Sequence, residues 1–181
     1  MIEVEEGRIP GLIRLCPTVY ADDRGMFVKN YQEGWFADLG LPVSWPERFY
    51  SRSHRRVIRG LHFQSPPADH DKLVYCVRGA AMDVAVDLRV GSPTYGDFDV
   101  FDLKDDNWSS LFIPKGLAHG FAALMDATVM AYATTTGYDS AMDAGIRWDS
   151  LPIPWPFADP IISPRDAALP PFAEFVSSFT Y

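Results

Sequence analysis

The sequence has few residues of the kinds that mark secreted, membrane-spanning or metal-binding proteins. Its 181 residues include only two cysteines, Cys16 and Cys76, which lack the short spacing of metal-binding pairs and are expected to be reduced, packed thiols. No apolar stretch is long enough to span a membrane, and the segment Met1–Glu6 is acidic where a secretory signal would be basic. We therefore expect a cytoplasmic protein that makes no membrane contact.

Basic residues are scarce as well. The chain has 16 lysines and arginines against 24 aspartates and glutamates, which gives a formal net charge of -8. A nucleic-acid-binding surface needs a basic face that neutralises phosphates, so this composition argues against such a partner. An anionic small molecule can still bind where the few cations gather.

The abundant residues indicate an all-β protein. The 15 prolines, 13 glycines and many aromatic residues occur in short segments separated by turns, which is typical of a sandwich or barrel. The length and the 48% apolar content suffice for one core, so residues 1–181 are expected to form a single domain. Helical periodicity is confined to residues 32–39. Strands are expected at residues 57–64, 72–78, 80–89, 96–103, 108–113, 120–123 and 128–135.

The segment after Trp155 is rich in proline and cannot join a central strand. We expect it to wrap over the barrel or over a neighbouring subunit. One strand, residues 82–87, alternates apolar residues with Asp83, Ala85 and Asp87. If both faces of this strand are covered, the two aspartates line an interior cavity. The alternative is a solvated outer face that carries two aspartates.

The segment Val57–Gln64 contains the most informative cluster, because it delivers Arg59, His62 and Gln64 within six residues. A histidine titrates near physiological pH and can act as a general base, while a nearby arginine can hold a phosphate or carboxylate. The alternative is a histidine that is simply hydrogen-bonded inside a barrel.

A second histidine, His119, follows Pro114 and Gly116 in a Pro-x-Gly-x-x-His pattern that resembles the second metal-binding motif of cupin barrels. The first cupin motif would supply two histidines one residue apart and a glutamate, yet His62 is followed by Phe63 and Gln64. We therefore expect no metal at this site.

Tyr132 and Tyr138 are candidate proton donors. A phenol can reprotonate an enolate on the face opposite the base, although each tyrosine, taken alone, is better explained as a packed aromatic residue whose hydroxyl has a hydrogen-bond partner. The basic residues Arg24, Arg59, Lys72 and Arg165 come from distant segments and could form a local positive site.

Several motifs occur in an order that resembles the dTDP-4-dehydrorhamnose 3,5-epimerase family. They cover nearly the whole chain, at residues 23–25, 59–64, 72–74, 78–79, 83–87, 91–96, 112–120, 145–148 and 160–166. The resemblance implies a jelly-roll cupin barrel with short peripheral helices. It also implies a homodimer that epimerises a nucleotide-linked 4-keto-6-deoxy sugar at C3, C5 or both, without a cofactor.

Site residues follow from the same resemblance. His62 matches the family's general base, Asp166 the carboxylate paired with it, Tyr132 the general acid and Lys72 the cation that stabilises an oxyanion. Further positions resemble residues that contact the substrate, and here the arginines suit a pyrophosphate. They are Arg24, Arg59, Gln64, His119, Tyr138, Asp143 and Arg165.

The chain departs from the family pattern where the family holds the nucleoside, at Lys29, Glu47 and Phe49. A carboxylate such as Glu47 can accept hydrogen bonds from the N1 and N2 donors of guanine, whereas thymine offers one donor. This difference predicts tighter binding of GDP than of dTDP. Neutral variation of a dTDP-specific site is the alternative.

Other functions on the same scaffold remain open from the sequence. They are a 3,4-ketoisomerase, an epimerase that inverts only C3 or only C5, a non-catalytic sugar-binding cupin and a metal-dependent cupin dioxygenase. Retention of His62, Lys72, Tyr132 and Asp166 together favours a catalyst over a silent binding protein.

Overall fold

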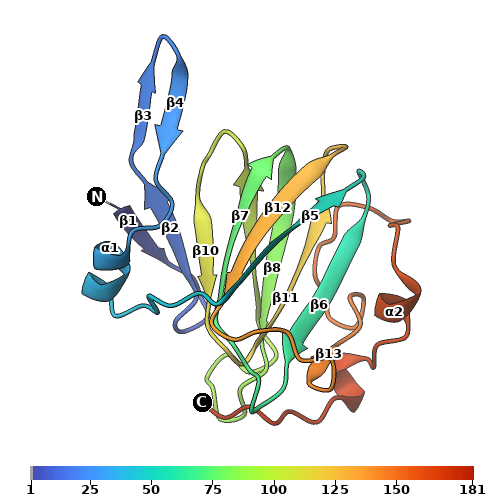
Figure 1. Cartoon of the computed structure of the whole chain (residues 1–181). Helices are drawn as coiled ribbons and strands as arrows, with labels where there is room; N and C mark the ends of the chain where they lie inside the picture. The colour runs from blue at the N-terminus through green and yellow to red at the C-terminus, as the bar shows by residue number, and fades with distance from the viewer. Residues whose placement is uncertain (1) are drawn as a thin grey trace.

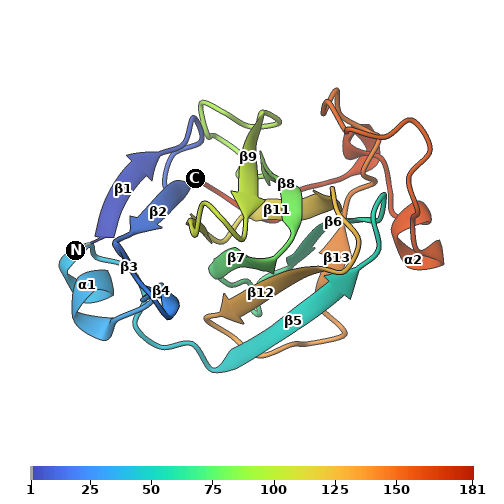
Figure 2. The same ribbon diagram turned by 90° about the horizontal axis from the view of Figure 1, so that it is seen from above.

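The computed structural model describes residues 2–181, which form two antiparallel β-sheets packed face to face (Figures 1 and 2). One sheet has the strand order β1 (Ile2–Glu6), β2 (Ile13–Pro17), β10 (Ser110–Ile113), β7 (Lys72–Arg78), β12 (Thr128–Thr134), β5 (Glu47–Ser53). The other has the order β13 (Asp143–Gly145), β6 (Ile58–Gln64), β11 (Leu117–Ala123), β8 (Ala80–Asp87), β9 (Phe98–Lys104). The all-β barrel predicted from the sequence is confirmed.

The smaller elements lie outside the barrel. A hairpin of β3 (Val19–Asp22) and β4 (Gly25–Val28) stands away from it (Figure 1). Helix α1 (Glu33–Asp38) begins after Gln32, whose side chain accepts a hydrogen bond from the Trp35 amide. The tail contains α2 (Pro164–Ala167) and a 3-10 turn η1 (Phe172–Glu174). No helix within residues 2–181 is long and apolar enough to cross a membrane.

The strand predictions after residue 72 are confirmed, with ends that differ by up to three residues. Strands β1 to β5 and β13 were not predicted. Strands β1, β3, β4 and β13 have only three to five residues, and most side chains of β3, β4 and β5 are exposed. The helix predicted at residues 32–39 corresponds to α1, which buries Phe36.

Three apolar layers organise the molecule. The inner layer lies between the sheets and includes Val74, Leu111 and Phe121. The outer face of the five-stranded sheet is covered by the tail, and the outer face of the six-stranded sheet packs against Phe36 and Trp45. Because β8 is covered on both sides, all eight of its residues are buried.

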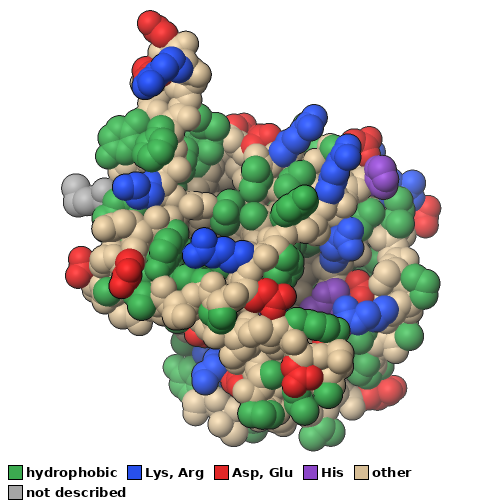
Figure 3. Space-filling view, in the orientation of Figure 1, with side chains coloured by type: hydrophobic (Ala, Val, Ile, Leu, Met, Phe, Trp, Pro, Cys, Tyr) green, Lys and Arg blue, Asp and Glu red, His purple; other side chains and the backbone are tan. Residues whose placement is uncertain are grey.

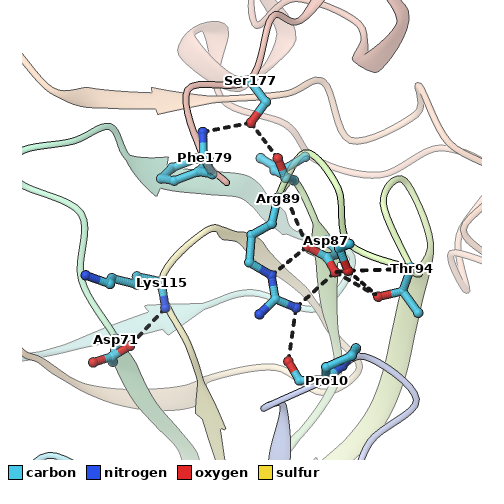
Figure 4. A network of polar contacts seen from close by, with 10 residues as sticks. Pro10, Asp71, Asp87, Arg89, Thr94, Lys115, Ser177 and Phe179 are labelled. Atoms are coloured by element: carbon cyan, nitrogen blue, oxygen red, sulfur yellow. Dashed lines mark hydrogen bonds and ion pairs between the residues drawn. The ribbon is translucent and has the colours of Figure 1, made fainter. Parts of the chain in front are cut away.

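The tail packs on the barrel of its own chain. Phe172, Phe175 and Phe179 join the layer that contains Met82, Val84 and Val86 of β8. Thr180 forms a β-bridge with Val90, and the Ser177 hydroxyl donates to the Leu88 carbonyl at 2.5 Å (Figure 4). The segment thus covers the outer face of the five-stranded sheet. Packing over the barrel is one of the two arrangements expected for it, the other being packing over a neighbouring subunit.

Asp87, one of the two aspartates expected in the interior, is the last residue of β8 and lies in a network of polar contacts (Figure 4). It is fully buried and accepts hydrogen bonds from Arg89 Nε at 2.8 Å, Ser92 Oγ at 2.6 Å and Thr94 Oγ1 at 2.7 Å. Burial opposes the charged form, but these hydrogen bonds hold the pKa of Asp87 below its usual range. Arg89 also donates to the Pro10 carbonyl at 3.0 Å, so the network joins segments distant in sequence.

Candidate active site

A cavity of about 490 Å³ opens between the two sheets. Figure 3 shows a hollow in the molecular surface with a histidine side chain between basic and acidic side chains. The structure brings most of the predicted site residues together in the wall of this cavity. They are Glu47, Phe49, Arg59, His62, Gln64, Lys72, His119, Tyr132, Tyr138, Asp143 and Arg165.

A β-bulge in β6 directs Arg59 and His62 into the same cavity. His62 pairs with His119 and Arg59 pairs with Phe121, so three residue steps along β6 lie opposite two along β11. The extra residue in β6 shifts the alternation of its side chains by one position. Gly60 lies at this point with φ +131°, and a Cβ there would lie 2.6 Å from the Cα of Gly120. Only glycines allow this close approach of the two strands.

Asp166 lies behind His62 and is 4% exposed. Its Oδ1 is 2.8 Å from His62 Nε2, and its Oδ2 accepts from the Gly60 amide at 3.3 Å. The Ser163 hydroxyl caps α2 by accepting from the Asp166 amide. Burial opposes ionisation, but the hydrogen bonds from His62 and Gly60 hold the pKa of Asp166 below its usual range. We assign the Nε2 proton of His62 to the hydrogen bond with the ionised Asp166, which leaves Nδ1 as the basic nitrogen.

Lys72 connects the two sheets at the cavity. It lies on β7 of the six-stranded sheet, and its Nζ donates to the His62 carbonyl of the five-stranded sheet at 3.0 Å. Burial lowers the pKa of Lys72 to about 8, although the carboxylates of Asp143 and Asp83 act in the opposite direction. Lys72 is thus a fixed cation at neutral pH that loses its charge in mildly alkaline solution.

Tyr132 lies on β12, in the sheet opposite to the one that carries His62. Its ring stacks on Phe49 at a centroid distance of 4.7 Å, and its hydroxyl is 3.5 Å from the Ser51 hydroxyl. Burial raises the pKa of Tyr132 well above its ordinary value, and the hydrogen bond with Ser51 acts in the opposite direction. The phenol therefore keeps its proton and can donate it.

The rim of the cavity is an ion-paired cluster. Arg165 Nη2 donates to Asp143 Oδ2 at 2.7 Å, and Arg165 Nη1 is 3.1 Å from His62 Nε2. The Tyr138 hydroxyl donates to the same Asp143 oxygen at 3.2 Å, and its amide donates to Glu47 Oε2 at 2.5 Å. Glu47 therefore holds the backbone of the loop that carries Tyr138.

Gln64 holds two loops beside the cavity. Its Nε2 donates to the Ala68 carbonyl at 2.8 Å and the Gly137 carbonyl at 3.2 Å, while its Oε1 accepts from the Asp139 amide at 2.6 Å. Nε2 also lies 3.2 Å from Nδ1 of His70. Burial lowers the pKa of His70 to about 4, with a contribution from the Lys72 charge, so this imidazole is neutral at pH 7 and accepts. Gln64 is thus fully bonded and acts on a ligand mainly through the loops it positions.

His119 is held by Asp83. Its Nε2 lies 2.9 and 3.0 Å from the two carboxylate oxygens, and both residues are buried. Asp83 thus lies in the interior, which is one of the two positions expected for the aspartates of this strand. It does not line the cavity, but lies beneath the cavity wall.

Two predicted site residues lie elsewhere in this chain. Arg24 is on the β3–β4 hairpin, where its highly exposed guanidinium pairs with Asp22. Lys29 Nζ lies 5.7 Å from the Trp35 ring centroid. Neither residue is part of the cavity wall, because their segment extends away from the barrel (Figure 1).

Some site residues were not identified from the sequence. Ser51, His70 and Thr134 line the cavity, and Asp83 holds His119. The alternation of β5 could have indicated Ser51, since Glu47, Phe49 and Ser51 share one face of that strand. No sequence signal identifies His70, which comes from a loop.

Together these groups form a site for proton transfer on an anionic ligand. A carboxylate-held histidine faces a protonated phenol across the cavity, and a buried ammonium lies beside the histidine. Arg59 and Arg165 add positive charge at the wall, as an anion requires.

Comparison with known proteins points to one family. The model of the family described as dTDP-4-dehydrorhamnose 3,5-epimerase matches residues 6–174. The dTDP-4-dehydrorhamnose 3,5-epimerase of Escherichia coli (strain K12) is 42% identical over 165 residues, which cover 89% of each chain. A dTDP-4-dehydrorhamnose 3-epimerase of Streptomyces niveus is 40% identical over 161 residues, covering 87% of this chain and 78% of that protein.

A solved structure shares the fold at high similarity. It is a dTDP-6-deoxy-D-glucose-3,5-epimerase of Legionella pneumophila Philadelphia 1 in complex with dTDP-4-keto-L-rhamnose, with a TM-score of 0.95 and 33% sequence identity. The match covers 100% of this chain and 99% of that one.

The charge of Lys72 can be measured directly, since Lys29, Lys104 and Lys115 are the only other lysines. We expect the [ε-¹³C]lysine NMR signal that disappears in Lys72→Met to titrate with a midpoint near 8, because burial disfavours the ammonium. A midpoint of about 10.4, the value of a solvated lysine, would contradict the buried position of this side chain.

Proposed function

The chain belongs to the dTDP-4-dehydrorhamnose 3,5-epimerase family, and we propose that its cavity inverts C3, C5 or both of a nucleotide-linked 4-keto-6-deoxy sugar. It is an isomerase of the nucleotide-sugar epimerase class. The relatives include an enzyme named as a 3,5-epimerase and one named as a 3-epimerase, so the number of inverted centres is a property to be measured. The cytoplasmic location expected from the sequence stays a prediction.

The observation that carries this proposal is the placement of His62 and Tyr132 on opposite walls of one cavity, with Lys72 bonded between the sheets. Epimerisation requires a proton to leave one face of the sugar ring and another to arrive on the opposite face. A single acid–base group on one wall cannot serve both faces of a fixed ring.

We assign the steps as follows. His62 Nδ1 removes the proton from a carbon next to the C4 ketone, and the electron pair of the broken C–H bond moves to O4. Lys72 stabilises the resulting enolate oxygen, and Asp166 stabilises the imidazolium. Tyr132 then donates its proton to the same carbon from the other face as the electron pair on O4 re-forms the ketone. The His62 imidazolium releases its proton to solvent, and the Tyr132 phenolate takes one up from solvent. Each role is filled by a side chain, so the proposal includes no cofactor.

The remaining wall residues would hold the substrate. Arg59 and Arg165 suit the two phosphates, because a guanidinium binds phosphate oxygens in pairs. His119, Tyr138 and Asp143 offer hydrogen bonds to the sugar, and Phe49 offers a flat apolar surface. Gln64 supports the loop that carries Tyr138.

We propose that the nucleotide is dTDP-linked, in place of the guanine nucleotide that the sequence favoured. Recognition of guanine N1 and N2 would require both oxygens of Glu47. One of them already accepts from the Tyr138 amide, so Glu47 supports a loop of the site. The ligand of the Legionella relative is dTDP-linked, which gives independent support.

We further propose that the protein is a homodimer in which the β3–β4 hairpin of one copy reaches the cavity of the other. The hairpin exposes Tyr20, Met26 and Phe27, and the outer face of the six-stranded sheet exposes Tyr50 and Val77. An apolar groove of about 430 Å³ lies on that face. This arrangement would bring Arg24 and Lys29 of one copy to the substrate in the cavity of the other copy, although they do not reach the cavity of their own chain.

The reaction can be tested by solvent exchange. With dTDP-4-keto-6-deoxyglucose in deuterated water, His62→Asn should lower deuterium incorporation at C3 and C5 by about 10²–10⁴-fold, because the base is absent. Tyr132→Phe should retain exchange better than net epimerisation, because the base can still act. NMR of the sugar signals measures both.

His54→Asn is a matched control for the histidine, since His54 is exposed and outside the cavity wall. No exchange in the wild type would point to a binding protein, and a 3-keto product would point to a ketoisomerase. Equal loss of exchange and epimerisation in Tyr132→Phe would make Tyr132 a packing residue.

The identity of the nucleobase is tested by calorimetric titration of dTDP and GDP. We expect dTDP to bind more tightly than GDP by about tenfold, or 1.4 kcal/mol, with a similar difference in Glu47→Gln, whose amide oxygen can still accept from Tyr138. Tighter binding of GDP that weakens in Glu47→Gln would restore the guanine interpretation.

The dimer is tested by mixing inactive variants. Arg24→Ala and His62→Asn should each be nearly inactive. An equimolar re-assembled mixture should recover about one quarter of the wild-type sites, since about half of its dimers are mixed and each mixed dimer contains one intact site of two. Sedimentation should give twice the chain mass of 20.3 kDa. Absence of recovery in a mixture proven to contain mixed dimers would place Arg24 outside the site.

A further inference from the structure

Asp83 is a buried carboxylate that the proposed reaction does not use. It lies on β8 opposite Phe121 of β11, and His119 lies two residues away on the same face of β11. Its side chain is fully buried beneath the cavity wall. Both of its oxygens lie within hydrogen-bond distance of His119 Nε2, at 2.9 and 3.0 Å.

A buried carboxylate is costly unless hydrogen bonds and opposite charge compensate it. The neighbouring Asp87, on the same face of β8, has Arg89 as its counter-ion. Asp83 has the ring of His119 and, electrostatically, the ammonium of Lys72, whose pKa its charge raises. The charge of Asp83 also raises the pKa of the buried Tyr132.

We propose that Asp83 is a positioning residue of the epimerase site, which acts through the orientation of His119 and the charge of Lys72. The two-oxygen contact holds Nε2 of His119 toward Asp83 and leaves Nδ1 as the ring nitrogen available to the sugar. The same negative charge balances the ammonium that would meet the enolate. This inference rests on the proposed function for its kinetic part, whereas the charge of Lys72 can be measured without substrate.

Other groups around Lys72 also affect its charge, and the test must separate them from Asp83. Titratable and charged groups also line the cavity beside Lys72. They come from five strands (β5, β6, β11, β12 and β13), from the loops at residues 65–71 and 135–142, and from α2. They are Glu47, Arg59, His62, His119, Tyr132, Asp143, His70, Tyr138 and Arg165.

The test compares Asp83→Asn with wild type by [ε-¹³C]lysine NMR and by the pH profile of kcat/KM. In the variant, the Lys72 midpoint should fall clearly below 8, and the alkaline limb of kcat/KM should move with it, because this limb reports the free enzyme. We expect kcat/KM at pH 8 to fall about tenfold, with partial recovery at lower pH. A uniformly lower profile with an unchanged Lys72 midpoint would overturn the proposal.

Asp87→Asn is the matched control, because it removes a buried carboxylate from the same strand face without touching the cavity wall. The Lys72 midpoint should not change in it, and an equal fall would overturn the proposal. If Asp83→Asn does not fold, His119→Gln carries the test. Its amide can still donate to Asp83, so the Lys72 midpoint should remain near 8 while kcat/KM falls, and unchanged kcat/KM would overturn the role of His119. Absence of solvent exchange with the wild-type enzyme would refute the proposed function. The lysine titration would still test the effect of Asp83 on the charge of Lys72.

Discussion

The contact between two glycines on neighbouring strands decides which side chains enter the cavity. Gly60 and Gly120 approach so closely that a Cβ on either would meet backbone atoms of the other strand below 3 Å. The bulge at this point moves Arg59 onto the same side as His62, so one strand supplies both a cation and the base. Without the bulge, regular alternation would turn Arg59 to the opposite face of the sheet.

Carboxylates within and behind the cavity wall organise its basic side chains. Asp166 lies behind His62, Asp83 behind His119 and Asp143 beside Arg165. Each fixes a ring or guanidinium in orientation and compensates positive charge that would otherwise be concentrated in a partly dry space. This arrangement explains how a protein with a net charge of -8 can present a local site for an anion.

Much of the fold and site could be predicted, and the exceptions have physical reasons. The pattern of apolar and polar side chains, together with turn residues, was sufficient to predict β7 to β12. Strand β3 was missed because its side chains are largely exposed and show no apolar alternation, and β1 was missed because its alternation covers only five residues. The motif around His62 indicated its role, but no local pattern shows which buried carboxylate pairs with a given histidine. Asp166 came from family resemblance, and the partnership of Asp83 and His119 required the register of β8 and β11.

The cover of the five-stranded sheet comes from residues far along the chain. Ser177 contacts Leu88 across 89 positions, and the aromatic residues of the tail pack on β8. During synthesis, the apolar outer face of β8 is therefore made well before the tail that covers it. Nascent chains expose a wide apolar strand surface during that interval, when chaperone binding competes with aggregation. The rate of translation between β8 and the tail would thus influence the yield of folded protein.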